Sequence, residues 1–212
     1  MPGIALDTIA DFQSRVNKFN ADYTADWNHW LGVPTIQRPI QLGRILRKWQ
    51  ACRPNRMRRE AMASLHCPPY LEDLTAMAAP YIAALETFDI ASSHSLRNPM
   101  HIAALHELWK IFEQLSYQGK ARGGLAGSVG ISKAVMLLTD GRVGPAFDSK
   151  VRNELDLAPI LSSTDWLAAL DTVSSDIELF QWSQHMPFTS VVPVTFRHLH
   201  NGRIYDMALG PR

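Results

Sequence analysis

The stretch Gly123-Gly-Leu-Ala-Gly-Ser-Val-Gly-Ile-Ser-Lys-Ala-Val-Met-Leu-Leu138 joins a glycine-rich turn to an apolar helix that is expected to begin near Ile131. After a short loop, Gly144-Pro-Ala-Phe-Asp-Ser-Lys-Val-Arg152 brings Asp148 to the start of a second helix. Glycines let a phosphate approach the backbone closely, and a helix N-terminus offers unsatisfied N–H groups. The order therefore predicts a helical hairpin in which backbone donors and one carboxylate lie near each other.

Both halves of this unit also have an ordinary structural interpretation. Glycine-rich connections between helices are common, and aspartate is a favoured N-cap residue, so Asp148 also suits the start of a capped helix. From these residues alone, anion binding and a plain helical hairpin both remain open. The two differ at Asp148, because a catalytic carboxylate should face a cavity, whereas a cap is used by the N–H groups of its own helix.

Apolar residues recur at three- and four-residue steps along most of the chain, which predicts a mainly α helical bundle around this unit. A tryptophan-containing segment, 27–31, ends at Gly32 and Pro34. Pro80 is expected to kink or split its helix. The predicted helices span residues 4–19, 40–49, 56–65, 70–88, 100–115, 131–138, 148–155 and 163–182.

The C-terminal segment has a different pattern. Residues 191–199 are rich in β-branched and aromatic side chains, and Asn201-Gly202 separates them from the short apolar run 204–207. Asn-Gly between two such runs is the strongest short hairpin signal. The sequence therefore predicts a C-terminal β-hairpin.

Length and composition suit one globular unit spanning residues 1–212, without a clear linker. Two helical lobes, with the hairpin and Asp148 at their cleft, are a second arrangement that the length allows. The chain is 46% hydrophobic and 19% charged, as in soluble proteins, and no apolar run is long enough for a membrane span. The N-terminus lacks a signal-peptide pattern, so we expect a cytoplasmic protein whose two cysteines, Cys52 and Cys67, are free thiols. Two cysteines also exclude a four-cysteine iron–sulfur cluster within this chain, and no cofactor is expected.

Basic residues cluster in one segment although the net charge is only +1. Residues 38–59 hold 8 of the 21 basic side chains and no acid. A local cationic surface would attract phosphate; the alternative is a solvated helix face paired with acids from elsewhere. The eight are Arg38, Arg44, Arg47, Lys48, Arg53, Arg56, Arg58 and Arg59.

The central unit resembles the helix–hairpin–helix DNA glycosylase superfamily over about residues 123–152. In that family a Leu-Pro-Gly-Val-Gly-like hairpin leads into a helix with an alanine and aliphatic residues. A loop then delivers an aspartate before a Thr-His-Val-x-Arg-like helix. The matching pieces here are Leu125-Ala-Gly127-Ser-Val-Gly130, Ala134, Leu137-Leu138 and Ala146-Phe-Asp148-Ser-Lys-Val151-Arg152.

The resemblance implies a DNA glycosylase that hydrolyses the N-glycosidic bond of a flipped-out base with Asp148 as the catalytic carboxylate. The base would be damaged, or chemically modified as in foreign DNA met during anti-phage defence. The implied partner is double-stranded DNA, bound by a monomer. The implied DNA contacts are Gly127, Ser128, Val129, Gly130, Ser132, Lys133, Lys150 and Arg152.

Two departures from the family pattern bear on the mechanism. The hairpin has an extra residue, Ser128, and lacks the usual proline. Ser132 occupies the position at which bifunctional members carry a nucleophilic lysine, and Lys133 follows one residue later, roughly 100° around the helix. The pattern therefore favours a monofunctional enzyme that leaves an abasic site. The alternative from another functional class is a non-catalytic helix–hairpin–helix module that binds nucleic acid or a protein partner. A third interpretation is a defence or regulatory protein that shares a helical hairpin by chance, for which the residues of the basic cluster should be dispersed over the surface, away from Gly127.

Aromatic residues are the candidates for stacking on an extruded base. Trp27, Trp30, Trp49 and Tyr117 are the rings considered, and His29 could donate to a base edge, although each also suits the core or surface. His198 and His200 alternate on the predicted strand and so share a face. A metal site would need a third ligand that the sequence does not nominate, so none is expected.

Overall fold

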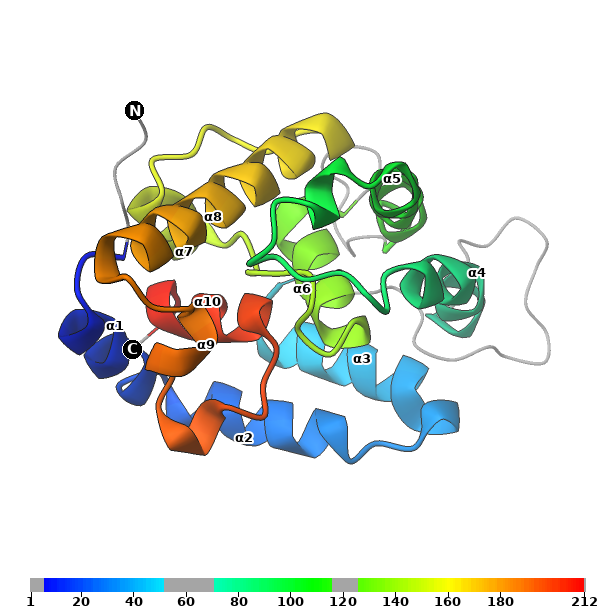
Figure 1. Cartoon of the computed structure of the whole chain (residues 1–212). Helices are drawn as coiled ribbons and strands as arrows, with labels where there is room; N and C mark the ends of the chain where they lie inside the picture. Colours follow the sequence, from blue (N-terminus) through cyan, green and yellow to red (C-terminus); the bar gives the residue numbers. More distant parts are fainter. Residues whose placement is uncertain (1–5, 52–70, 116–125, 212) are drawn as a thin grey trace, which may run out of the picture.

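The computed structural model describes residues 6–51, 71–115 and 126–211, and these residues form helices and connecting segments without a β-strand (Figure 1). Short 3-10 turns occur at Thr35–Gln37 (η1), Ser95–Arg97 (η2) and Val194–Phe196 (η4). The α-helices are α1 (Ile9–Asn17), α2 (Ala21–Leu31), α3 (Arg38–Lys48), α4 (Leu71–Ala84), α5 (Pro99–Phe112), α6 (Ser128–Leu138), α7 (Ser149–Glu154), α8 (Ser163–Gln184), α9 (Phe188–Val191) and α10 (Asn201–Leu209).

The prediction of a mainly helical fold is confirmed, and most of the predicted helices occur near their expected positions. Side-chain caps explain several starts: Thr8, Asn20, Asn98 and Ser162 each accept an N–H from the first turn of the following helix. Pro80 lies inside α4 without ending it. The predicted helix 56–65 and the first part of the glycine-rich turn, 123–125, lie outside the described residues.

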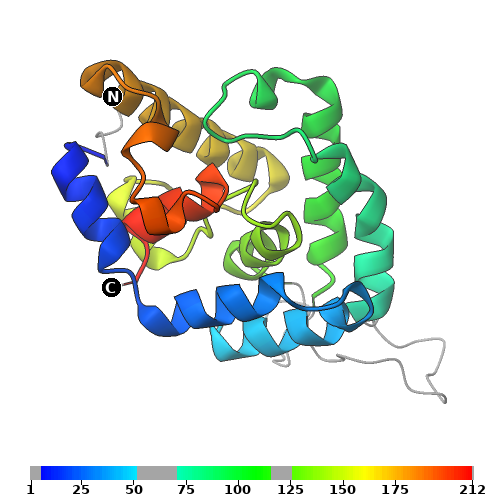
Figure 2. The same ribbon diagram turned by 60° about the horizontal axis from the view of Figure 1, so that its bottom comes forward.

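Helices α6 and α10 occupy the centre of the molecule. Figure 2 looks nearly along α6 and shows α2 and α3 on one side, α4 and α5 on another, and α8 on a third. Every residue of α6 from 130 to 138 is buried, and so is every residue of α10 from 202 to 209. Helices α3 and α5 pack on α6, whereas α1 and α7 pack on α10. Buried apolar residues from α1 to α10 form one contiguous cluster.

The predicted C-terminal β-hairpin is wrong. Residues 191–199 end α9 and form the turn η4, and Asn201-Gly202 begins α10. Helix α10 has only nine residues, fewer than the window in which a helical period is reliably recognised, so the local Asn-Gly signal and the short apolar run after it resembled a hairpin. Gly202 is not part of a tight turn; it allows the loop 141–147 to approach α10 closely. A Cβ added there would lie 2.6 Å from the Gly141 carbonyl oxygen and 2.8 Å from the Gly144 nitrogen.

This close approach of α10 to the loop 141–147 joins the C-terminus of the chain to the segment that carries Asp148. The loop begins at Gly141, whose φ of 84° lies in the left-handed region and closes the end of α6. The Gly141 N–H donates to the Met136 carbonyl, and the Arg203 N–H donates to the Gly141 carbonyl. The start of α7 is therefore anchored to both central helices.

Among the described helices, none combines the length and the apolar character that crossing a lipid bilayer requires.

Candidate active site

Helix α6 begins at Ser128, three residues before the predicted start at Ile131. Gly127 is its N-cap and is exposed, and a Cβ added there would meet nothing within 4 Å. The Gly127 carbonyl accepts the N–H groups of Gly130 and Ile131, at 3.0 and 3.2 Å. Only the N–H groups of Ser128 and Val129 therefore remain in the first turn as donors for an anion, and Gly130 is a buried helical residue.

The two carboxylate oxygens of Asp148 have different partners. It is the N-cap of α7, and its Oδ1 accepts the N–H groups of Lys150 and Val151, at 3.0 and 3.1 Å. Its Oδ2 lies 3.9 Å from the Lys133 Nζ. The side chain keeps 18% of its surface exposed. One oxygen thus caps the helix, as the structural interpretation predicts, while the other faces a charged partner, and Asp148 does not line either of the two cavities described below.

Lys133 lies on the buried side of α6 and faces Asp148. Its side chain is 6% exposed, and Nζ lies 5.6 Å from the Tyr23 ring centre and 5.7 Å from that of Trp49. Burial lowers the pKa of Lys133, and the charges of Asp148 and Asp206 oppose that shift. The offset of Lys133 from the family's lysine position thus does not turn its amine away from the carboxylate.

Tyr23 is a neighbour of this pair that the sequence did not nominate. Its pKa is raised, first by burial and then by the negative charges of Asp148, Asp206 and Asp26. Trp49 donates from Nε1 to Asp26 at 2.9 Å, and Tyr23 packs on Trp49 with ring centres 5.1 Å apart. Helices α2 and α3 therefore provide an aromatic wall beside the ammonium group.

A second pair that the sequence did not nominate, Arg203 and Asp206, lies on α10. The Arg203 Nη1 lies 2.5 Å from the Asp206 Oδ2, and both side chains are almost fully buried. The guanidinium lies over the rings of Trp27 and Phe19, 4.6 and 4.8 Å from their centres. The spacing of opposite charges at i and i+3 in an otherwise apolar run was the available signal for this pair.

The proposed base-pocket residues occupy different places. Trp27 and Trp30 are in the core, and Trp30 donates from Nε1 to the Leu137 carbonyl at 2.8 Å. His29 is exposed on α2. Tyr117 lies outside the described residues. Trp49 is in contact with the site, since its ring centre lies 5.7 Å from the Lys133 Nζ.

The residues predicted to contact DNA on α6 and α7 lie in different surroundings. The Ser132 Oγ accepts the Phe147 N–H at 3.0 Å, so this hydroxyl serves the loop before Asp148. Lys150 lines an open hollow of about 570 Å³ together with Ser149, Asn153 and Glu154. Arg152 is partly buried on the same helix.

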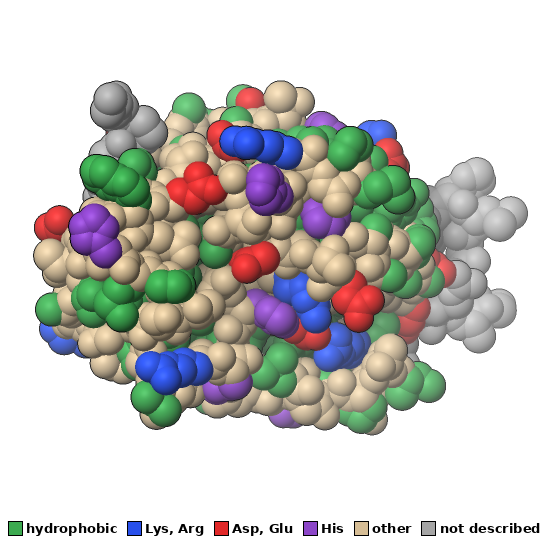
Figure 3. All heavy atoms as spheres, viewed as in Figure 1, with side chains coloured by type: hydrophobic (Ala, Val, Ile, Leu, Met, Phe, Trp, Pro, Cys, Tyr) green, Lys and Arg blue, Asp and Glu red, His purple; other side chains and the backbone are tan. Residues whose placement is uncertain are grey.

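The basic cluster does not form one free cationic surface within the described residues. Arg38 lies 3.5 Å from the Asp140 carboxylate and 5.0 Å from the centre of the Trp30 ring. Lys48 pairs with Asp26 at 2.6 Å, while Arg44 and Arg47 are exposed. On the face shown in Figure 3, basic and acidic side chains are intermixed. Arg53, Arg56, Arg58 and Arg59 lie outside the described residues.

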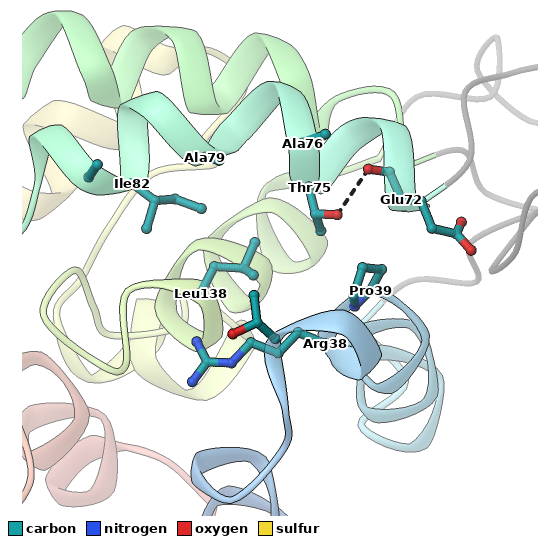
Figure 4. Close-up of a pocket in the computed structure, with 10 residues that line it drawn as sticks. Arg38, Pro39, Glu72, Thr75, Ala76, Ala79, Ile82 and Leu138 are labelled. Atoms are coloured by element: carbon teal, nitrogen blue, oxygen red, sulfur yellow. Dashed lines mark hydrogen bonds between the residues drawn. The ribbon is translucent and has the colours of Figure 1, made fainter.

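A mostly apolar cavity of about 440 Å³ lies between α3, α4 and the end of α6. Figure 4 shows Leu138 pointing toward α4, with Arg38 below it, Pro39 to its right, and Ala76 and Ile82 on the opposite wall. Neither Asp148 nor Lys133 lines this cavity. It is therefore separate from the cluster around Asp148.

Within residues 6–51, 71–115 and 126–211, no group of three or more His, Cys, Asp or Glu side chains is placed to hold a metal ion. His198 and His200 precede α10 and are not on a strand. The chain matches no protein-family model, no curated protein and no solved structure.

Proposed function

We propose that the protein is a DNA N-glycosylase that removes a flipped-out damaged or modified base from double-stranded DNA and leaves an abasic site. The observation that carries the proposal is the divided role of Asp148. Its Oδ1 is fixed by two N–H groups of α7, while its Oδ2 lies 3.9 Å from the buried Lys133, and the side chain as a whole is 18% exposed. The resemblance of residues 123–152 to helix–hairpin–helix glycosylases supplies the reaction class.

The reaction needs little more than a fixed negative charge. Once the base is extruded, the N-glycosidic bond stretches and positive charge develops on the sugar. The Asp148 carboxylate would stabilise that charge and orient or deprotonate the attacking water. Its hydrogen bonds to the N–H groups of Lys150 and Val151 hold the carboxylate in place, so no reorganisation is needed during the reaction.

The DNA backbone would be bound at the starts of α6 and α7. The N–H groups of Ser128 and Val129 can donate to one phosphate, and exposed Gly127 allows close approach. Lys150 beside its open hollow would contact the same strand electrostatically.

Lys133 favours a second candidate, in which base release is followed by strand cleavage. Burial lowers the pKa of this amine, which increases the fraction of its nucleophilic, neutral form. The amine would add to the aldehyde of the abasic sugar and lose water to form an imine. Loss of a proton from the adjacent carbon then expels the 3′ phosphate.

The test is base release from ordinary duplex DNA, duplexes with damaged bases, and genomic DNA from phages with modified bases. Abasic sites are scored by alkaline cleavage. We expect Asp148→Asn to lower the rate about 100- to 1,000-fold, the range for loss of one preorganised electrostatic group. Asparagine remains a good N-cap, so this variant should fold.

Three outcomes of this test separate the alternatives. Strand cleavage without alkali, with a borohydride-trapped adduct that Lys133→Gln abolishes, would establish the second candidate. DNA binding without abasic sites would instead support a non-catalytic nucleic-acid-binding module. A protein that neither binds nor cleaves any of these DNAs would refute the proposal.

A further inference from the structure

The segment Ala146–Asp148 is held by side chains from both central helices. Ala146 and Phe147 are buried, so water cannot satisfy their N–H groups. The Ala146 N–H donates to the Asp206 Oδ1, and the Phe147 N–H donates to the Ser132 Oγ, both at 3.0 Å. Two successive backbone donors immediately before the N-cap are therefore bound to α10 and α6.

The Asp206 carboxylate is itself rigidly held. Its Oδ2 pairs with the Arg203 Nη1 at 2.5 Å, and its Oδ1 accepts from Ala146. The Arg203 guanidinium packs against the rings of Trp27 and Phe19, which restricts its movement. Arg203 thus binds one carboxylate oxygen and the Ala146 N–H binds the other. The Asp206 side chain therefore connects the buried helix α10 to the backbone that leads into Asp148.

We propose that Asp206 is a positioning residue for Asp148: by binding the Ala146 N–H, it fixes the direction in which the Asp148 carboxylate faces Lys133. The catalytic meaning of this contact rests on the proposed function. The contact itself explains why a buried carboxylate, paired with Arg203, lies beside the site. Helix α10, which carries it, has no other role in the proposed reaction.

Charge alone could also explain an effect of Asp206, because it contributes to the field at Lys133. Other ionisable groups around this site are Tyr23 and Asp26 on α2, Lys48 on α3, and Arg203 on α10. A useful test must therefore hold the charge constant while removing the hydrogen-bond acceptor.

Two double variants do this. Arg203→Met with Asp206→Asn removes both charges but keeps an amide oxygen for the Ala146 N–H. Arg203→Met with Asp206→Leu removes the same charges and the acceptor at similar volume. Asp176→Asn is the control, since Asp176 is a buried carboxylate on α8 that also binds α10, but through the Tyr205 hydroxyl, which donates to it at 2.6 Å.

Two readouts are compared between the double variants. Hydrogen exchange of the Lys150 and Val151 amides reports the Asp148 cap without requiring activity. The turnover number for base release reports catalysis, with DNA affinity measured separately. We expect the leucine variant to show about tenfold faster exchange and a turnover number about 10- to 100-fold lower than the asparagine variant, at equal DNA affinity.

The outcomes separate this proposal from the proposed function. Equal exchange rates in the two double variants would overturn the positioning role. The same conclusion would follow if Asp176→Asn accelerated exchange of the Lys150 and Val151 amides as much as the leucine double variant does. Equal turnover numbers would overturn its role in catalysis. Different exchange rates in a protein that releases no base would keep the positioning contact and reject the glycosylase assignment.

Discussion

Helices α6 and α10 are both buried along most of their length, but they carry charge in different ways. Helix α10 contains both members of its ion pair, with Arg203 and Asp206 in contact at 2.5 Å. Helix α6 carries Lys133 alone, and its counter-charge, Asp148, lies 3.9 Å away on α7 with part of its surface exposed. The pair on α10 is closed, because its two side chains are in direct contact and almost fully buried, whereas the pair between α6 and α7 is wider and its carboxylate is partly exposed. Under the proposed function, α10 would support the site, and the starts of α6 and α7 would supply its reacting groups.

The largest expected effect comes from opening the closed pair. Arg203→Met leaves the Asp206 carboxylate buried without its cation, so we expect the free energy of unfolding to fall by about 3–5 kcal/mol. Lys133→Met removes a buried cation whose partner keeps its own hydrogen bonds to α7, and should cost much less. Urea denaturation measures both. Equal losses in the two variants would contradict the distinction between the helices.

The next effect concerns the glycines that begin the two helices. Gly202→Ala should destabilise the protein by about 1–3 kcal/mol, because its Cβ would press on the backbone of Gly141 and Gly144. An alanine within a helix is otherwise favoured over glycine by about 1 kcal/mol. Gly127→Ala is the control at an open N-cap, where the added Cβ meets no atom, and should cost no more than about 1 kcal/mol, from the poorer capping by alanine alone. Thermal unfolding of the two variants would show whether α10 packs as closely as described.

The same contrast explains which parts of the fold the sequence could predict. Helices such as α5 and α8 present their apolar residues at helical spacing, so their positions were predicted closely. Helix α10 is only nine residues long, so its apolar spacing is too short to decide between helix and strand, and its Asn201-Gly202 start imitated a hairpin turn.

The candidate site was predictable to a similar, partial extent. Asp148 was found because its motif is local: a loop, a cap and a short helix lie together in sequence. Tyr23 and Asp206 reach the site only through tertiary packing from opposite ends of the chain. The i, i+3 spacing of Arg203 and Asp206 could indicate an ion pair, but not its place beside Asp148. The orientation of Lys133 depends on how α6 packs, which its offset from a family motif does not determine.

The smallest effect is a pH dependence specific to Lys133. Burial lowers the folded-state pKa of this lysine below its unfolded value of 10.5. Between those two values the unfolded chain binds more protons than the folded protein, so stability rises with pH. The stability of the wild type relative to Lys133→Met should therefore increase as the pH is raised from about 7 to about 10, with a slope no steeper than about 1.4 kcal/mol per pH unit.

Comparing the two proteins cancels groups they share, including Tyr23, whose raised pKa acts in the opposite direction at higher pH. A difference that stays constant over this range would mean that Lys133 keeps its proton in the folded protein as readily as a lysine in water. The neutral amine needed for attack on an abasic sugar would then be scarce at neutral pH, and the monofunctional reaction would be favoured over strand cleavage.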